Sequence, residues 1–417
     1  MNLGENALYW CNALAEFTET PGQMQRSYLT DCHQQAINQL EHWLEDAQLP
    51  SWMDAAGNLW GRLPAREEDA PRVVIGSHID TVPNGGIYDG ILGIVLPLLV
   101  MKQFRQQGIA LPFHLDLVAF GDEEGTRFGT TLLGSRALTG HWDSNWAGLT
   151  DASGVSLAEA FRQFELDIDR VKDASLRGHP PLAFLEVHIE QGPILEEEQL
   201  PVGIVTAING ARRFSIELTG MAGHAGTVPM HLRQDALAAA AEITLIVERV
   251  AREHGVTATV GRIQAEPGAV NVIAGKTRLS LDIRSERDGE RDAALTMIWD
   301  TAKLACHERG IHMDWQETHS APSVACADSL QRCLAGAIAE LGITPKYLAS
   351  GAGHDAMAMA NLCPVGMMFV RCEGGISHHP DEAITAGDAH QAGLALKGWL
   401  LKLAAAVQSG EYRPTLV

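Results

Sequence analysis

Three short apolar runs in the first half of the chain each end in a cluster of histidine and acidic residues. The runs cover residues 72–76, 114–120 and 183–187, and they lead into the strings SHIDT, GDEEG and HIEQG. Apolar runs of this length that end at polar residues are typical of buried strands. Because helical patterns at 32–46 and 90–106 lie around them, we expect an α/β sheet with helices on both faces. Ligands of such sheets bind beyond the carboxyl ends of the strands, which is where the clusters fall.

The pattern changes at about residue 212, which indicates a second domain. Strands are expected at 213–218, 257–263, 277–283 and 311–317, and helices at 234–252 and 291–309, in the ferredoxin-like order β-α-β-β-α-β. Helices at 328–341 and 389–407 and a strand at 364–370 then resemble the first part again. We therefore expect a catalytic domain made of residues 1–209 and 324–417, split by an inserted domain at 210–323. A chain of 417 residues is long enough for two cores.

Charge and composition exclude several classes of partner. The formal net charge of −21 repels phosphate backbones and anionic lipid, so we expect neither nucleic acid nor membrane as a partner. The most apolar run, residues 91–101, is shorter than the roughly 20 residues that span a bilayer and reads as a buried helix. The seven cysteines lack paired short spacing, and the N-terminus lacks the features of a secretory signal. A cytoplasmic protein is the resulting expectation.

The first polar cluster contains His78, Asp80 and Asp89. A histidine at a strand end can offer one imidazole nitrogen to a metal ion while a nearby acid orients the ring. Glycines lie close to Asp89, and a carboxylate has two oxygens that can bridge two ions. A solvated Asp-Gly turn beside a partly buried histidine is the alternative interpretation of this cluster taken alone.

The second cluster joins Asp122, Glu123 and Glu124 directly after a strand. Adjacent carboxylates repel one another, so they require a cation or full solvation. Solvation is the simpler explanation for such a loop in isolation. With a cation, one glutamate would ligate the ion and the other would take a proton from water.

Two later clusters place His188 and His378 beside acids and glycines, in EVHIEQG and GGISHHPDE. Each is a weak signal alone, but four such clusters at corresponding strand ends are hard to attribute to chance. Mixed histidine and carboxylate ligands suit Zn²⁺, Mn²⁺, Co²⁺ or Ni²⁺ better than Ca²⁺ or Mg²⁺.

These motifs resemble the M20 family of metallopeptidases with two co-catalytic ions. The strings GSHIDTVPNGGIYDG, DEEGTRFG, EVHIEQGPILE, GHAGTVPM, NVIAGKTRLSLDIR and SGAGHDA resemble one branch in particular. That branch holds N-carbamoyl-L-amino acid hydrolases, allantoate and ureidoglycolate amidohydrolases and β-ureidopropionases. The resemblance implies an aminopeptidase-like three-layer catalytic domain with a mixed sheet, and an inserted ferredoxin-like domain that acts as a lid and dimerises.

The resemblance also implies two divalent ions that share one carboxylate. One ion would be bound by His78, Asp89 and His188. The other would be bound by Asp89, Glu124 and His378. Peptidase members usually carry an acid at the position of His188, so the histidine marks the amidohydrolase branch.

Catalytic and substrate-binding roles are implied in the same way. Glu123 takes the general-base position and Asp80 lies behind His78. His224 of the insert would stabilise the oxyanion and contact substrate. A surface loop histidine is the alternative for His224 alone. The other substrate-contacting positions implied by the branch are Gln191, Asn271, Arg284, Gly351 and His354.

The expected activity is hydrolysis of a non-peptide C–N bond in a ureido acid, with release of ammonia. Arg284 would pair bidentately with the substrate carboxylate, whereas its alternative is a surface ion pair with Asp282 or Glu286. The sequence leans slightly to N-carbamoyl-L-amino acids. Allantoate or ureidoglycolate, and then dipeptides, are the alternative substrates, and a non-catalytic metal-binding protein is the remaining class. A homodimer is implied, with His224 able to reach the partner's site.

Overall fold

The computed structural model describes residues 2–414 of the chain and divides them into two compact units. Unit 1 combines residues up to Thr206 with residues from Ala325 onward, and unit 2 is the segment Ala207–Val324. Each unit has a hydrophobic core of its own. The two units are therefore described separately.

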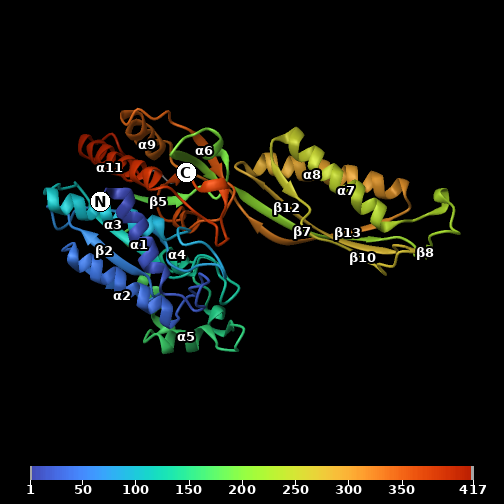
Figure 1. Ribbon diagram of the computed structural model, residues 1–417, viewed down its shortest axis with the longest axis horizontal. Coiled ribbons are helices and arrows are strands. Elements are labelled where there is room, and N and C mark those ends of the chain that lie inside the picture. The colour runs from blue at the N-terminus through green and yellow to red at the C-terminus, as the bar shows by residue number, and fades with distance from the viewer. Residues whose placement is uncertain (1, 415–417) are drawn as a thin grey trace. The chain divides into compact units, whose positions relative to one another are not determined.

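Unit 1 is built on one mixed sheet in the order β1-β2-β4-β3-β5-β16-β6-β14, with β15 paired to β6 (Figure 1). The strands β4, β3, β5 and β16 run parallel to one another, whereas β2 and β6 pair antiparallel at the two sides of this group. The strand bounds are β1 Ser51–Met53, β2 Leu59–Leu63, β3 Arg72–His78, β4 His114–Phe120, β5 Ala183–Ile189, β6 Val202–Ile208, β14 Val324–Ala325, β15 Tyr347–Ser350 and β16 Val365–Val370.

Helices cover both faces of this sheet. The principal core joins α1, α2, α3, α9 and α11 to alternate strand residues such as Val73 and Ile75. The intervening residues, including Phe120 and Phe184, pack together on the opposite face, where α4 and α10 lie. The helix bounds in unit 1 are α1 Leu3–Ala15, α2 Asp31–Asp46, α3 Leu92–Gln107, α4 Leu133–Leu138, α5 Leu157–Gln163, α6 Ile194–Glu197, α9 Asp328–Glu340, α10 Asp355–Met359 and α11 Ala386–Ser409, with the 3₁₀ turns η1 Ser144–Gly148, η2 Ile168–Ala174 and η4 Glu373–Gly375.

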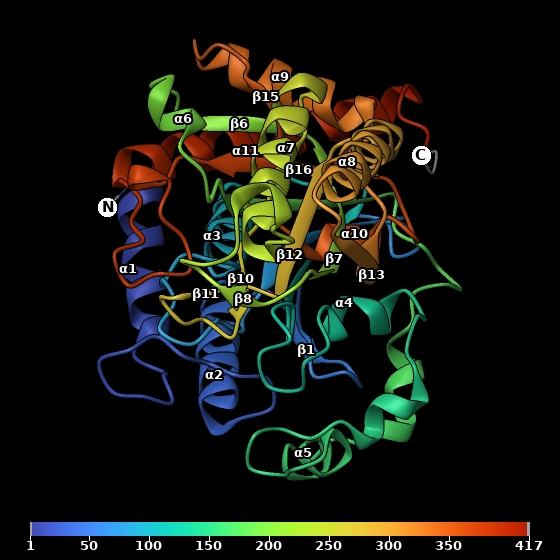
Figure 2. The same cartoon turned by 90° about the vertical axis from the view of Figure 1, so that its right-hand side faces the viewer.

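Unit 2 has an antiparallel sheet in the order β10-β12-β7-β13, with β9 also paired to β12. The helices α7 and α8 both lie on one face of this sheet, side by side (Figures 1 and 2). The other face carries alternate residues that are partly exposed. The bounds in unit 2 are β7 Gly210–Thr219, β8 Gly223–His224, η3 Met230–Leu232, α7 Ala236–His254, β9 Thr257–Thr259, β10 Ile263–Glu266, β11 Val272–Ile273, β12 Lys276–Ser285, α8 Asp288–Glu308 and β13 His312–Ala321.

One of the expected strands is divided in the structure. The single strand expected at 257–263 is two strands, β9 and β10, separated by Val260, Gly261 and Arg262. The expected buried helix at 91–101 is the N-terminal part of α3, and Pro97 lies inside it. Within residues 2–414 no helix has both the length and the apolar character needed to cross a membrane.

Candidate metal centre

The polar clusters gather at one edge of the sheet of unit 1. His78 is the last residue of β3, Glu123 and Glu124 follow the end of β4, and His188 lies near the end of β5. His378 follows the end of β16. Because these four strands are parallel, their carboxyl ends meet at the same edge and bring together residues that are far apart in sequence.

Asp89 lies at the centre of the cluster and is almost fully buried. Its Oδ1 atom is 3.1 Å from Nε2 of His188 and 3.7 Å from Nε2 of His78. Ligand atoms from these three residues all lie within 4.8 Å of one another, a spacing that a single metal ion can bridge.

The second oxygen of Asp89 faces a different set of residues. Oδ2 is 3.1 Å from Nε2 of His378, which in turn is 3.4 Å from Oε1 of Glu124. Asp89, Glu124 and His378 also form a group within 4.8 Å. His78, Glu123 and Glu124 form a further group of the same kind, so Glu123 also lies within reach of a cation.

The orientation of two histidine rings selects the nitrogen that can bind a metal. Nδ1 of His78 is 2.9 Å from the carbonyl oxygen of Asp80, and Nδ1 of His188 is 2.9 Å from the carbonyl oxygen of Ile189. A ring that donates from Nδ1 to a carbonyl keeps its lone pair on Nε2. In both rings Nε2 is the atom directed at Asp89.

Charges of opposite sign stabilise one another across this cluster. Burial disfavours the charged form of both rings, yet the hydrogen bond and charge of Asp80 raise the pKa of His78, and those of Asp89 raise the pKa of His188. Hydrogen bonds to Asp89 and Glu124 raise the pKa of His378 to about 10. Burial favours a neutral Asp89, but hydrogen bonds from His188 and His378 lower its pKa well below the ordinary value.

The donor set fits a divalent cation on the chemistry of its atoms. Nε2 of His188 is buried and has no hydrogen-bond partner among residues 2–414, although Oδ1 of Asp89 is close. Two lone pairs that face each other at this distance require a positive charge between them, either a proton or a metal ion. Imidazole nitrogens mixed with carboxylate oxygens are the ligands of Zn²⁺, Mn²⁺, Co²⁺ and Ni²⁺.

Asp80 does more than the sequence predicts. Its carboxylate Oδ1 lies 3.4 Å from Nδ1 of His78, while its two oxygens accept hydrogen bonds from the backbone amides of Glu123 at 2.9 Å and Glu124 at 3.1 Å. Asp80 therefore ties the end of β3 to the loop after β4. Burial is the largest cause that raises the pKa of Glu123, and the neighbouring acids Glu124 and Asp355 add to it.

Three of the expected substrate-binding residues of unit 1 lie around the same cluster. The ring of His354 is buried and packs edge-on against the ring of His188, with centroids 4.5 Å apart. Gly351 is exposed in the same loop. The amide nitrogen of Gln191 donates to Ser377 at 3.0 Å and to Asp89 at 3.3 Å, which leaves its buried Oε1 without a partner among residues 2–414.

The remaining expected residues lie in unit 2 and are not all together. His224 in β8 pairs with Val272 in β11, directly after Asn271. Arg284 lies near one end of β12, and its guanidinium forms two hydrogen bonds to Asp282, at 2.7 and 2.9 Å. From Arg284 to Lys276 the strand advances eight residues (284 − 276 = 8), which spans about 27 Å. Figure 1 shows β8 beyond the Lys276 end of β12.

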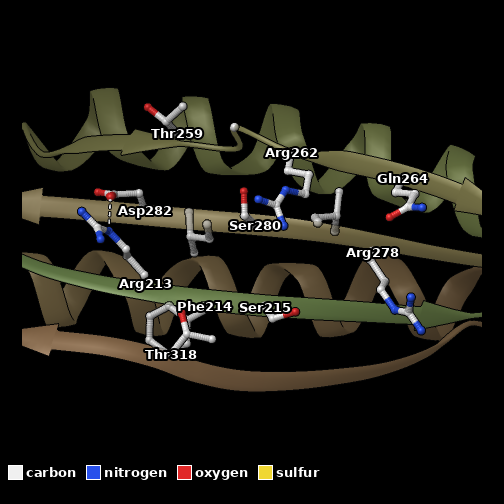
Figure 3. Close-up of a pocket in the computed structure, with 13 residues that line it drawn as sticks. Arg213, Phe214, Ser215, Thr259, Arg262, Gln264, Arg278, Ser280, Asp282 and Thr318 are labelled. Carbon is white, nitrogen blue, oxygen red and sulfur yellow. Dashed lines mark hydrogen bonds and ion pairs between the residues drawn. The ribbon is translucent and has the colours of Figure 1, made fainter. Parts of the chain in front are cut away.

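Unit 2 also contains a cavity of about 410 Å³ on the sheet face opposite its helices. Figure 3 shows its lining, in which Arg213 pairs with Asp282. Arg262, between β9 and β10, and Arg278 of β12 also line the cavity. None of the expected metal ligands lines this cavity. Its arginines and hydroxyl groups form a polar surface on the same face as Arg284.

Glu382 is a residue at this centre to which the sequence assigned no role. It is buried beneath the Asp89 loop, and its carboxylate contacts the segments that carry Asp89 and His378. It belongs to the string GGISHHPDE, so the motif was visible in the sequence. The direction of its side chain was not.

Comparison with known proteins identifies the family of this chain. The model of "Peptidase family M20/M25/M40" matches residues 74–402. The chain is 38% identical over 377 residues to N-carbamoyl-L-amino acid amidohydrolase of Geobacillus stearothermophilus. The match covers 90% of this chain and 92% of that one. It is 35% identical over 422 residues to allantoate deiminase 1 of Glycine max, covering 94% and 87% of the two chains.

A solved structure is similar over almost the whole chain. The amidase of the hydantoinase/carbamoylase family from Burkholderia multivorans has a TM-score of 0.91 at 30% identity, and the match covers 96% of this chain and 98% of that one. The likeness therefore extends over both units.

Proposed function

This chain belongs to peptidase family M20/M25/M40, and from that premise we propose that it uses two divalent cations to hydrolyse a C–N bond of N-carbamoyl amino acids or related ureido acids. It is a hydrolase of the amidohydrolase type. The expected product is ammonia together with the remainder of the ureido acid. The seven free thiols fit a reducing compartment, and we propose the cytoplasm.

One observation carries the proposal of two ions. The two oxygens of Asp89 face two different histidine sets, His188 and His78 on one side and His378 on the other. A carboxylate between two such sets can bridge two cations. Zn²⁺, Mn²⁺, Co²⁺ and Ni²⁺ are the candidates, since each accepts mixed nitrogen and oxygen ligands.

When bound, divalent cations polarise the scissile group and lower the pKa of water. Glu123 supports the reaction as a proton carrier. Burial raises the pKa of Glu123, so its carboxylate is a stronger base that can accept a proton from the attacking water and pass it to the departing nitrogen. Gly353 lies beside this carboxylate, since a Cβ atom added at Gly353 would be 3.7 Å from Oε1 of Glu123.

Substrate recognition is assigned to polar groups in both units. Gln191 has a buried, unpartnered Oε1 that can accept a hydrogen bond from a substrate N–H group. Gly351 and His354 belong to the loop that reaches Glu123. Arg284 would bind the substrate carboxylate, and its pairing with Asp282 holds the guanidinium in place while sharing its charge.

The separation of His224 and Arg284 supports the proposal of a homodimer. The extent of β12, about 27 Å, exceeds the length of a ureido acid, so the two residues of one chain cannot contact the same small substrate. We propose that His224 and Asn271 act in the site of a second copy, where His224 stabilises the oxyanion. Large exposed apolar side chains on the same unit support an interface there, among them Met221, Met230, Leu232, Leu245 and Val270.

The dimer is tested by a charge placed on the exposed face of α7. Leu245→Arg should convert a dimer to a monomer in sedimentation velocity, because its side chain is 66% exposed in the single chain. Leu401→Arg on α11, where the leucine is also exposed, is the control and should leave the mass unchanged. A monomeric wild-type protein would refute the proposed dimer.

The substrate is tested by measuring ammonia release after chelation and reloading with each of the four cations. The panel contains N-carbamoyl-L-amino acids, N-carbamoyl-β-alanine, allantoate and ureidoglycolate. We expect turnover of N-carbamoyl-L-amino acids, with allantoate as the second candidate, in line with the two kinds of relative. Release of amino acids from dipeptides, with no ammonia from any ureido acid, would favour the dipeptidase alternative instead.

A further inference from the structure

Glu382 connects two loops that each carry a proposed metal ligand. Its Oε1 accepts hydrogen bonds from the backbone amides of Tyr88 at 3.0 Å and Asp89 at 3.1 Å. Its Oε2 accepts a hydrogen bond from the hydroxyl of Ser377 at 3.1 Å, and Ser377 directly precedes His378. One buried carboxylate therefore holds the Asp89 segment and the His378 segment together.

The backbone opposite Glu382 is shaped for this contact. A Cβ atom added at Gly86 would lie 2.1 Å from the carboxyl carbon and from Oε1 of Glu382. Any side chain at Gly86 would push the carboxylate away from the amides of Tyr88 and Asp89. Gly86 itself is not in the left-handed region, so its requirement is one of space.

The His378 loop lacks the support that the other histidines have. His78 and His188 are in strands, and each is anchored by Nδ1 to a carbonyl oxygen. Within residues 2–414 the polar contacts of the His378 ring all involve Nε2, and the ring is half-exposed. His378 has a φ of +55°, in the left-handed region that is unfavourable for a non-glycine residue. Such a backbone persists only where neighbouring contacts hold it.

We propose that Glu382 is a positioning residue that fixes the Asp89 and His378 loops to each other, so that Asp89, Glu124 and His378 form a complete cation set. The inference rests on the proposed two-cation function. It gives the set that contains His378, whose loop is less well anchored, a structural support. His78 and His188 remain anchored without Glu382. Loss of Glu382 therefore weakens one set more than the other.

The test measures Zn²⁺ binding to the full-length protein by equilibrium dialysis, with the bound metal determined by mass spectrometry. The wild-type protein is expected to bind two ions. In Glu382→Ala one of the two affinities should fall about 10- to 100-fold, the range for loss of a group that orients a ligand. Glu382→Gln keeps an oxygen for the two amides, so it should recover much of that affinity.

The matched control is Glu190→Ala. Glu190 is also a buried carboxylate, and it accepts hydrogen bonds from the backbone amides of Ile194 and Leu195 rather than from the amides of Tyr88 and Asp89. It should retain both affinities. Thermal unfolding of the metal-free variants compares the structural cost of the two substitutions, so a selective loss of one metal is separated from general destabilisation.

Gly86→Ala provides a second route that keeps the Glu382 carboxylate. It should weaken the binding of the same Zn²⁺ ion as Glu382→Ala does. It therefore tests the proposal even if Glu382→Ala does not fold. Equal Zn²⁺ affinities in Glu382→Ala, Gly86→Ala and Glu190→Ala would overturn the role of Glu382. A wild-type protein that binds fewer than two ions would instead overturn the proposed two-cation function.

Discussion

Nε2 of His188 lies 3.1 Å from Oδ1 of Asp89, and both residues are almost fully buried. The pKa of the imidazole is raised and that of the carboxyl is lowered, so the pair holds a proton when no cation is bound. His378 shares this behaviour on the other oxygen of Asp89. A metal ion must therefore displace protons when it binds.

Metal uptake is accordingly expected to release protons at neutral pH. Because the pKa of His378 is raised to about 10, its ring carries a proton at pH 7.5 in the metal-free protein, and metal affinity should increase with pH through this range. Titration calorimetry with Zn²⁺ in two buffers of different ionisation enthalpy measures the number released. Identical binding enthalpies in both buffers would contradict the charge state assigned to the metal-free cluster.

The roles of two adjacent glutamates are expected to separate by mutation. Glu123→Gln should lower turnover of a ureido acid about 10²- to 10⁴-fold, since an amide cannot carry the proton, while metal content stays at the wild-type level. Glu124→Gln should lose metal, because Glu124 faces His378. Metal analysis of both purified proteins decides between these roles. A loss of metal in Glu123→Gln would make Glu123 a ligand, as its position within reach of His78 also permits.

The sequence predicted the clusters at the strand ends better than the contacts within them. Apolar runs followed by His78, Glu124 and His188 identify strand ends from local patterns alone. Parallel pairing then brings them to one edge, because the carboxyl ends of parallel strands coincide. The role of Glu382 depends on a side chain that reaches a loop 293 residues away, and no local pattern contains that information.

In unit 2 as well, local sequence patterns predicted some elements but not their details. The alternation of its strands predicted a sheet, whereas the short strands β8 and β11 were not expected. The break between β9 and β10 covers Val260, Gly261 and Arg262, where the apolar alternation gives no signal. The pairing of Arg284 with Asp282 was one of two alternatives, because residues two apart in a strand lie on the same face.

Gly90 is expected to be required for the first metal set. It has a φ of +70°, and a Cβ atom there would lie 2.5 Å from Cε1 of His78. Gly90→Ala should therefore displace the ring and weaken Zn²⁺ binding by the set that contains His78. Equilibrium dialysis of the purified variant measures this loss.

Gly108→Ala is the matched control for Gly90→Ala. Gly108 ends α3 with a φ of +66°, but nothing lies within 4 Å of its Cβ position. The alanine at this position should lower stability only through its left-handed backbone, by about 1–2 kcal/mol. Metal affinities should stay at the wild-type level in Gly108→Ala. Equal loss of metal in both variants would show that backbone strain, not contact with His78, causes the effect.

Stability should fall in mild acid because of His33. Its ring is buried, stacks on Phe164 and accepts a hydrogen bond from the amide of Leu29 at 2.9 Å. Burial lowers the pKa of His33 from 6.5 to about 3, so only the unfolded chain takes up this proton between those values. The contribution of the neutral His33 ring to the free energy of unfolding is fully present above pH 6.5. It is lost as the pH falls towards 3, by about 1.4 kcal/mol per pH unit at most.

His33→Asn isolates this contribution, because its side-chain oxygen can still accept the Leu29 amide while the residue no longer titrates. At pH 7 we expect the variant to be less stable than wild type, because the stacking on Phe164 is lost. Between pH 6.5 and pH 4.5 its free energy of unfolding should fall by less than that of wild type. Urea unfolding of the metal-free proteins at both values measures the difference. His42→Asn, at an exposed position on the same helix α2, should retain the wild-type dependence on pH. Parallel pH profiles for wild type and His33→Asn would mean that His33 is protonated in the folded protein.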